Sequence, residues 1–287
     1  MTNMINAISI DVEDYFQVSA FEHSIDRKSW DNLEHRVVEN MDKIFHLLAE
    51  VDVKATFFIL GWVAERYPDI VKKIIENGHE LASHGYGHQR VCDLTRDEFK
   101  KDVTKAKDIL ENLSAVAIKG YRAPSYSIGK KNIWALNVLA ESGYEYSSSI
   151  YPIQHDHYGY QEAPRFTFKD KKSGLVEIPI TTMKFMNRLF PAGGGGFFRF
   201  YPYSVSKWAI NRVNRLDHSP TVFYLHPWEL DPFQPRQQNI SAKSRFRHYL
   251  NLKKTESRLK HLLNDFQWGR MDDVFIKGKS IPVVSLS

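Results

Sequence analysis

Short apolar runs and runs of helical spacing alternate along the first part of the chain. Residues 7–10 and 55–60 are largely apolar stretches bounded by polar residues, which predicts buried strands. In residues 37–48 and 70–75, apolar side chains recur every three or four positions, which predicts helices with one buried face. These four segments predict a strand–helix repeat.

The repeat continues beyond residue 80. Thr95 followed by Glu98 forms a capping box and predicts a helix that runs to about Leu113. The apolar run 115–118 predicts another strand, and residues 134–140 predict another helix. Because strands that alternate with helices favour a parallel sheet, we expect an α/β fold.

Residues 153–201 interrupt this rhythm. They contain a predicted hairpin at 166–178 and four consecutive glycines at 193–196, which no Lys-Ser/Thr pair follows as it would in a phosphate-binding loop. We expect an insertion at about 153–201 on the rim of a single domain, 1–287, where it shapes the substrate site. His155 and His157 are expected to be loop residues, with substrate contact as the lesser alternative.

Two histidines suggest a metal site. His84 and His88 lie four residues apart just after a predicted strand end, at a spacing that lets two imidazoles face one ion. Such a pair requires a carboxylate, and the strand 7–10 is followed by Asp11, Glu13 and Asp14. Two histidines and one carboxylate leave open positions on a divalent ion, which suits metal-assisted hydrolysis.

Polar residues follow further predicted strands. Arg122 follows the run 115–118, with Pro124 and Tyr126 just beyond it, and His226 follows the β-rich run 221–225. A (β/α) barrel builds one active site from residues at the ends of successive strands. We therefore expect these residues to meet the histidine pair.

Length and composition fit one enzyme domain. A chain of 287 residues, 43% hydrophobic, can bury a large core. No stretch reaches the ~18 apolar residues of a membrane span, and the first residues lack a signal-peptide pattern, so we expect a cytoplasmic protein. The single cysteine, Cys92, is expected to be a small buried thiol near the site.

The net charge of +5 is mild for this length. Basic residues gather within 243–260 among apolar residues of roughly helical spacing, and we expect the solvated face of an outer helix. The alternative is a surface that approaches anionic lipid or a polyanionic substrate. No nucleic-acid-binding signature accompanies the charge, so no nucleic-acid partner is expected.

Taken in order, these motifs resemble the polysaccharide deacetylases of the NodB type, carbohydrate esterase family four. The resemblance covers roughly residues 7–230 and implies a distorted (β/α) barrel of seven strands. The DVEDYF start, the GGGGFFR run and the LHPWE segment resemble the deacetylases associated with exosortase and exopolysaccharide export systems. The resemblance implies removal of N-acetyl groups from amino sugars of a polysaccharide or a lipid-linked oligosaccharide, with possible peripheral contact to the inner membrane.

The resemblance also implies roles. Asp11 would be the general base, and Arg122 would hold it charged and oriented. The metal, Zn²⁺ or another divalent transition metal, would be bound by Asp14, His84 and His88. His226 would protonate the leaving amine, and the backbone N–H of Tyr126 would donate to the oxyanion.

The sequence departs from the family pattern in two places. Relatives have adjacent aspartates or aspartates separated by one residue, so Glu13 rivals Asp14 as the ligand. An aspartate that tunes the histidine acid is replaced by Ser147, and Glu229 or Asp231 could supply that charge instead.

Three more function classes remain open. Asp11 or Glu13 opposite Glu229, with Trp62 and Trp228 nearby, would suit a metal-free glycoside hydrolase, although the two histidines would then be unexplained. A hydrolase of small cyclic amides is the second class, and a catalytically inactive carbohydrate-binding relative is the third. The sequence does not indicate an oligomeric state.

Overall fold

The fold is organised around one large, mainly parallel sheet. A computed structural model describes residues 4–153, 159–238 and 240–286. In this part of the chain the sheet has ten strands, in the order β10-β1-β2-β3-β4-β5-β7-β6-β12, with β11 paired to β1. Every pair from β10 to β7 is parallel, which makes seven consecutive parallel strands. They are β10 (Val222–Leu225), β1 (Ile5–Val12), β2 (Thr56–Ile59), β3 (Glu80–Ser83), β4 (Gly120–Tyr121), β5 (Tyr146–Ser147) and β7 (Val176–Glu177).

Three further strands bring the sheet to ten strands. β6 (Phe168–Asp170) is antiparallel to β7, and β12 (Val283–Val284) pairs with β6. β11 (Gln267–Gly269) runs parallel to the beginning of β1. The expected α/β fold with a distorted barrel is therefore confirmed, and the predicted number of seven applies to its parallel strands rather than to the whole sheet.

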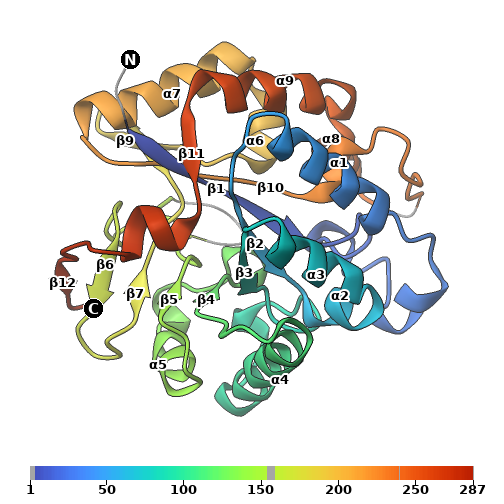
Figure 1. The fold of residues 1–287 in the computed structure, drawn as a ribbon, viewed down its shortest axis with the longest axis horizontal. Helices are drawn as coiled ribbons and strands as arrows, with labels where there is room; N and C mark the ends of the chain where they lie inside the picture. Colours follow the sequence, from blue (N-terminus) through green and yellow to red (C-terminus); the bar gives the residue numbers. More distant parts are fainter. Residues whose placement is uncertain (1–3, 154–158, 239, 287) are drawn as a thin grey trace.

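Helices lie around the outside of the sheet (Figure 1). The predicted helices over 37–48, 70–75 and 134–140 are present, and the helix predicted from the capping box begins after Thr95. The run 115–118 is not a strand, because Ala115 ends the preceding helix in a left-handed conformation. The helices are α1 (Val37–Ala49), α2 (Gly61–Arg66), α3 (Pro68–Glu76), α4 (Arg96–Ser114), α5 (Trp134–Glu141), α6 (Gly195–Phe200), α7 (Tyr203–Leu216), α8 (Ala242–Tyr249) and α9 (Leu252–Asp265).

The predicted insertion contains two hairpins. The hairpin predicted at 166–178 is formed by β6 and β7, and β7 belongs to the parallel set rather than to a rim loop. A separate two-stranded sheet, β8 (Thr182–Phe185) and β9 (Arg188–Pro191), follows. His155 and His157 lie outside the described residues. The extent of the single domain stays a prediction.

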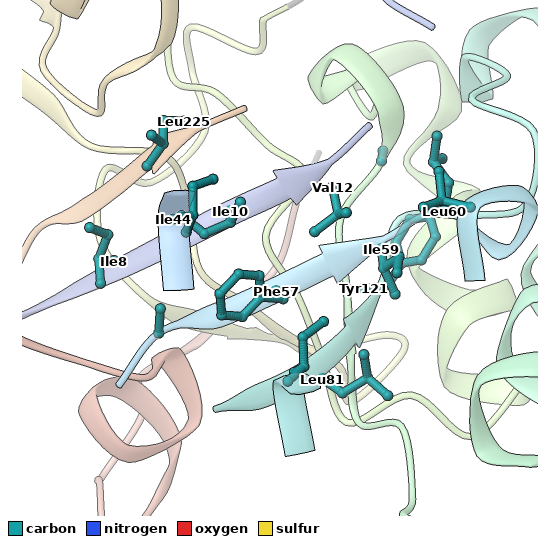
Figure 2. Packing of buried hydrophobic residues seen from close by; sticks show 14 of the residues in the cluster. Ile8, Ile10, Val12, Ile44, Phe57, Ile59, Leu60, Leu81, Tyr121 and Leu225 are labelled. Carbon is teal, nitrogen blue, oxygen red and sulfur yellow. The ribbon is translucent and has the colours of Figure 1, made fainter. Parts of the chain in front are cut away.

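Side-chain alternation along β1 separates two apolar layers. Figure 2 shows Ile8, Ile10 and Val12 close to Phe57 and Ile59 of β2, in the cluster that also includes residues of the outer helices. Ala7 belongs instead to the inner cluster, which includes Phe58, Tyr146 and Tyr224. Because successive side chains of a strand point to opposite faces, Ser9 and Asp11 share the inner face with Ala7. The parallel strands thereby carry polar groups into the barrel.

Among the described residues, no helix combines the length and the apolar character that a transmembrane span requires.

Candidate metal centre and active site

Three buried side chains converge at the carboxyl ends of β1 and β3. One ligand atom from each of Glu13, His84 and His88 lies within 4.8 Å of the others. The Nδ1 atom of His84 hydrogen-bonds the carbonyl oxygen of Arg122 at 2.8 Å, which leaves Nε2 for a metal. Burial lowers the pKa of His84 to about 4, so its imidazole is neutral at pH 7, as a metal ligand must be.

Glu13 supplies the carboxylate of this group. Its Oε1 accepts a hydrogen bond from Trp228 Nε1 at 3.2 Å, and its Oε2 lies 2.7 Å from His88 Nε2. Although Oε2 is buried, no donor meets it with hydrogen-bond geometry within the described structure. Burial raises the pKa of Glu13, but the charges of His88 and His226 outweigh it and lower this pKa to about 2. A buried anionic oxygen beside two imidazoles fits a divalent transition metal.

Asp14 is not part of this group, which corrects its assignment as the metal ligand. Its Oδ2 accepts the backbone N–H groups of Arg36 and Val37 at 2.7 and 3.0 Å, and its Oδ1 accepts that of Tyr15 at 2.8 Å. Arg36 and Val37 begin α1, so Asp14 caps free N–H groups of an outer helix. The alternation of β1 continues past its end and turns Glu13, with Asp11, toward the barrel interior.

Asp11 lies beside the three-residue group and is held by Arg122. Arg122 Nη1 donates to Asp11 Oδ1 at 2.6 Å and to Ser9 Oγ at 2.8 Å, and the guanidinium is fully buried. Asp11 Oδ2 faces His226 Nε2 at 3.9 Å and accepts the Tyr126 hydroxyl at 3.4 Å. Because Arg122 occupies Oδ1, Oδ2 is the oxygen placed to accept a proton.

The Tyr126 backbone N–H, the expected oxyanion donor, already has an acceptor in the structure. This N–H donates to the Ala123 carbonyl at 3.0 Å inside a short 3-10 turn, so its role toward an oxyanion stays a prediction. Tyr126 approaches the site through its hydroxyl instead. A sequence motif places this residue in the right loop, but it does not fix the direction of the backbone.

His226 has an anionic partner. Its Nδ1 lies 2.7 Å from Glu229 Oε1, and its ring stacks on Trp228 with centroids 5.2 Å apart. Burial lowers the pKa of His226, but the charge of Glu13 and the hydrogen bond with Glu229 outweigh it and raise this pKa to about 9. Asp231 pairs with Arg36 at 3.0 Å. Of the candidates from the sequence, Glu229 is therefore the partner of His226.

Ser147, which replaces the usual aspartate, is not in contact with His226. Its hydroxyl donates to Ser149 Oγ at 2.7 Å. Cys92 is exposed, so the expectation of a buried thiol near the site is wrong.

Arg199 is a site residue that sequence reasoning missed. Its Nε donates to Glu229 Oε2 at 2.5 Å, and its Nη1 donates to the carbonyl oxygen of His248 at 2.7 Å. The four glycines explain how it gets there. A Cβ on Gly194 would lie 2.2 Å from the Tyr224 carbonyl oxygen, and one on Gly195 would lie 2.5 Å from the Tyr224 hydroxyl. Only glycine lets this segment run so closely beside β10, where Gly194 and Tyr224 form a parallel bridge, and place Arg199 next to Glu229.

Removing Arg199 is expected to destabilise the fold. In Arg199→Met, the buried Glu229 carboxylate loses its guanidinium partner and keeps only His226, and the free energy of unfolding should fall by about 3 kcal/mol. Arg165→Met is the matched control, since Arg165 pairs with Asp217 at 3.0 Å in a partly exposed position and should cost about 1 kcal/mol or less. Urea denaturation measures both, and equal losses would contradict the role given to Arg199.

The Glu229 charge is expected to set the alkaline limb of the pH–rate profile if His226 acts as an acid. Glu229→Gln removes the anion that favours the imidazolium, so the pKa of His226 falls and the alkaline limb moves to lower pH. A bound cation would cancel part of the Glu13 charge, so the wild-type limb should lie below about 9. Asp231→Asn, which removes a carboxylate bound to Arg36, should leave the limb in place.

Comparison with known families agrees with this architecture. Residues 28–147 match the polysaccharide deacetylase family, and residues 148–276 match a domain family of unknown function, DUF3473. The chain therefore contains a segment that matches the polysaccharide deacetylase family, followed by a DUF3473 segment. One sheet contains strands of both segments, because β7 from the second pairs with β5 from the first. His226, Glu229 and Arg199 all lie in the second segment.

Individual relatives cover only part of the chain. A peptidoglycan-N-acetylglucosamine deacetylase of Bacillus cereus is 37% identical over 34% of this chain and 36% of its own length. A chitooligosaccharide deacetylase of Sinorhizobium fredii is 29% identical over 35% of this chain and 44% of its own. The first matched relatives are thus covered over about a third of their length.

The fold also occurs among solved structures. A Mycobacterium smegmatis protein, provisionally described as a polysaccharide deacetylase, superposes with a TM-score of 0.62 over 100% of this chain and 96% of its own. Its sequence identity is 16%, so this likeness concerns the fold.

Proposed function

We propose that the protein is a metal-dependent hydrolase that removes N-acetyl groups from amino sugars of a polysaccharide or a lipid-linked oligosaccharide precursor. The observation that carries the proposal is the convergence of Glu13, His84 and His88 beside an arginine-bound aspartate and a carboxylate-bound histidine. Deacetylases of N-acetylated amino-sugar polymers among the relatives support the choice of substrate.

Glu13, His84 and His88 would hold the ion, and their nitrogen and carboxylate atoms suit Zn²⁺. When bound, a divalent ion supplies Lewis acidity toward water and an acetamide carbonyl. Asp11 Oδ2 accepts the proton of the attacking water while Arg122 keeps the carboxylate oriented. His226 Nε2, 3.9 Å from Asp11 Oδ2, donates a proton to the leaving nitrogen, which gives a free amine and acetate.

The glycoside hydrolase alternative is poorly supported by the site. Glu229 would have to act across a sugar from Asp11 or Glu13, but its two oxygens are engaged by His226 and Arg199. Burial raises the pKa of Glu229, yet Arg199 and His226 outweigh it and lower this pKa to about 2, so Glu229 is not a proton donor near neutral pH.

Acetate release tests the proposal. Purified protein should carry about one divalent ion per chain, release acetate from N-acetylglucosamine oligomers, lose this activity on chelation and regain it with Zn²⁺. Hydrolysis of a small cyclic amide, measured on the same protein, tests the amidase alternative. Oligomer binding without acetate release in the presence of Zn²⁺, Co²⁺ or Mn²⁺ would mean an inactive carbohydrate-binding relative, and unchanged turnover without metal would contradict the proposed chemistry.

The setting of the reaction is part of the proposal. The resemblance to deacetylases of exopolysaccharide export systems supports a role in exopolysaccharide biosynthesis, in the cytoplasm at the inner face of the inner membrane. Polymeric and lipid-linked acceptors can be compared directly in the acetate assay. Cell fractionation with an epitope-tagged chain tests the location, and recovery outside the cell would contradict it.

Asp11→Asn separates the base from the ligands. This variant should retain the metal, because Asp11 is not in the group of ligand atoms, and should lose roughly 100-fold or more in turnover, because a proton acceptor is removed. Metal content and acetate release are measured on the same preparation. Loss of the metal, with activity restored by excess Zn²⁺, would mean that Asp11 is a ligand rather than a base.

A further inference from the structure

Residues 182–216 contain no Asp or Glu, although they contain several Lys and Arg. This segment forms the β8–β9 hairpin, α6 and α7, and β9 lies close to α7 in Figure 1. Arg199 and Lys207 of this segment pair with Glu229 and Asp265. The other cations have no carboxylate partner within the described part of the chain; they are Lys184, Arg188, Arg212 and Arg215.

The hairpin is packed firmly against α7. Met183 shares a buried cluster with Ala209 and Val213 of the helix. On the outer side, the rings of Phe185 and Trp208 meet edge to face with centroids 5.7 Å apart. The Arg212 guanidinium lies 5.7 Å from the Phe185 ring centroid, and its Nε donates to the Lys184 carbonyl at 3.1 Å. The hairpin and α7 therefore present one continuous surface.

Large apolar side chains on this surface face solvent. Met186 is 82% exposed at the tip of the hairpin, and other large apolar side chains of the hairpin and α7 are also exposed: Phe185, Phe190, Trp208 and Leu216. Met186 and Asn187, the two central residues of the turn, both have positive φ, at 45° and 58°. This turn favours Asn-Gly, so a methionine here holds a costly backbone conformation and remains exposed. Neither feature contributes to the core.

We propose that the β8–β9 hairpin and α7 dock the protein on an anionic lipid bilayer. Exposed aromatic and aliphatic side chains among unpaired cations are the combination that binds the interface of such a bilayer, where apolar groups enter the headgroup region and Lys or Arg contact lipid phosphates. A soluble polyanion would engage the cations but would leave Met186, Phe190 and Leu216 exposed. The apolar tip therefore favours the bilayer.

The docking surface is separate from the proposed active site. Thr181 directly precedes β8, and its hydroxyl accepts the backbone N–H of Val222 at 2.7 Å, where β10 begins. His226 follows the other end of β10. Substitutions in the hairpin should therefore alter membrane binding without changing hydrolysis of a soluble oligomer.

Vesicle sedimentation with the full chain tests the proposal. The protein should bind phosphatidylcholine vesicles that contain phosphatidylglycerol, should bind pure phosphatidylcholine vesicles much less, and should be released only in part at high salt. Arg188→Gln/Arg215→Gln should weaken binding to anionic vesicles about tenfold or more. Met186→Ser/Phe190→Ser should weaken it by a similar factor and should also reduce the fraction that stays bound at high salt.

Two double variants serve as matched controls for the charge change. Lys171→Gln/Lys172→Gln removes two exposed charges from the turn between β6 and β7 and should leave binding unchanged. Lys253→Gln/Lys254→Gln removes two exposed charges from α9, the other basic surface.

Three outcomes would contradict the proposal. Equal weakening in every charge variant would mean unspecific attraction, and selective weakening in the α9 variant would place docking on α9. Concentration-dependent dimers in light scattering, lost in Met186→Ser/Phe190→Ser, would mean that a second copy covers the surface. Each of these three outcomes overturns the proposal.

Discussion

Glu13→Gln is expected to lower the affinity for a divalent metal by roughly 100-fold or more, with acetate release falling to match. Removing a partner that only orients a ligand already costs 10–100-fold, and Glu13 is a direct candidate ligand. The amide keeps the size of the side chain but loses the negative charge beside two imidazoles. Its neutral oxygen is a weak ligand for Zn²⁺.

Asp14→Asn is the matched control, one residue along the chain. The same change from carboxylate to amide should leave metal affinity within about twofold, because Asp14 contacts backbone N–H groups rather than the histidines. The free energy of unfolding should instead fall by about 1–3 kcal/mol, since the amide nitrogen cannot accept the N–H groups of Arg36 and Val37.

Calorimetric Zn²⁺ titration and urea denaturation of both variants separate the two roles. Loss of metal affinity in Asp14→Asn with Glu13→Gln unaffected would restore Asp14 as the ligand. Loss in neither variant, with His84→Ala/His88→Ala still metal-free, would mean that the histidines bind the ion without a carboxylate from this segment.

The order of strands and helices was predictable because it depends on local patterns. The spacing of Ile8, Ile10 and Val12 along β1, and of apolar residues along α1, reflects a sheet covered by helices. Alternation along β1 also predicts which carboxylate is the ligand. Asp11 and Glu13 are two residues apart and point to the same side of the strand, whereas Asp14 points to the opposite side. The resemblance to the family pattern implies Asp14 as the ligand, whereas the alternation of side chains along the strand favours Glu13.

Other parts of the site depend on contacts between distant residues, which the sequence does not reveal. Arg199 reaches Glu229 only because the glycines lie at close range beside β10, and the glycine run alone predicts no partner for that arginine. The Tyr126 N–H donates a hydrogen bond to the Ala123 carbonyl oxygen, because Ser125 and Tyr126 have left-handed φ angles of 54° and 51°. Neither serine nor tyrosine is a residue type that predicts a left-handed conformation.

The candidate site contains residues from both sides of the boundary between the two family matches, at residues 147 and 148. Asp11 and Glu13 precede the polysaccharide deacetylase match, His84 and His88 lie within it, and His226 lies in the DUF3473 match. Trp228, also in the second match, donates to Glu13. The second segment therefore does more than extend the sheet, because it contributes the proposed acid and a hydrogen bond to a candidate metal ligand.

His226→Ala is expected to slow acetate release from an N-acetylated oligomer by roughly 100- to 1,000-fold while the metal stays bound, because an amide nitrogen must be protonated before it leaves. The loss should be much smaller with an activated aryl acetate, whose leaving group departs as an anion.

Metal content, acetate release and phenol release are compared on one preparation, with Asp11→Asn as the control. Asp11→Asn should slow both substrates, since each needs an activated water. A further check uses the geometry around His226, whose Nδ1 is held by Glu229 and whose Nε2 faces Asp11 and Glu13 at 3.9 and 3.5 Å. His226→Gln keeps a polar group there without a titratable proton, so it should be as slow on the amide as His226→Ala. Equal losses on amide and ester, or recovery of amide turnover in His226→Gln, would show that His226 positions the substrate rather than donating a proton.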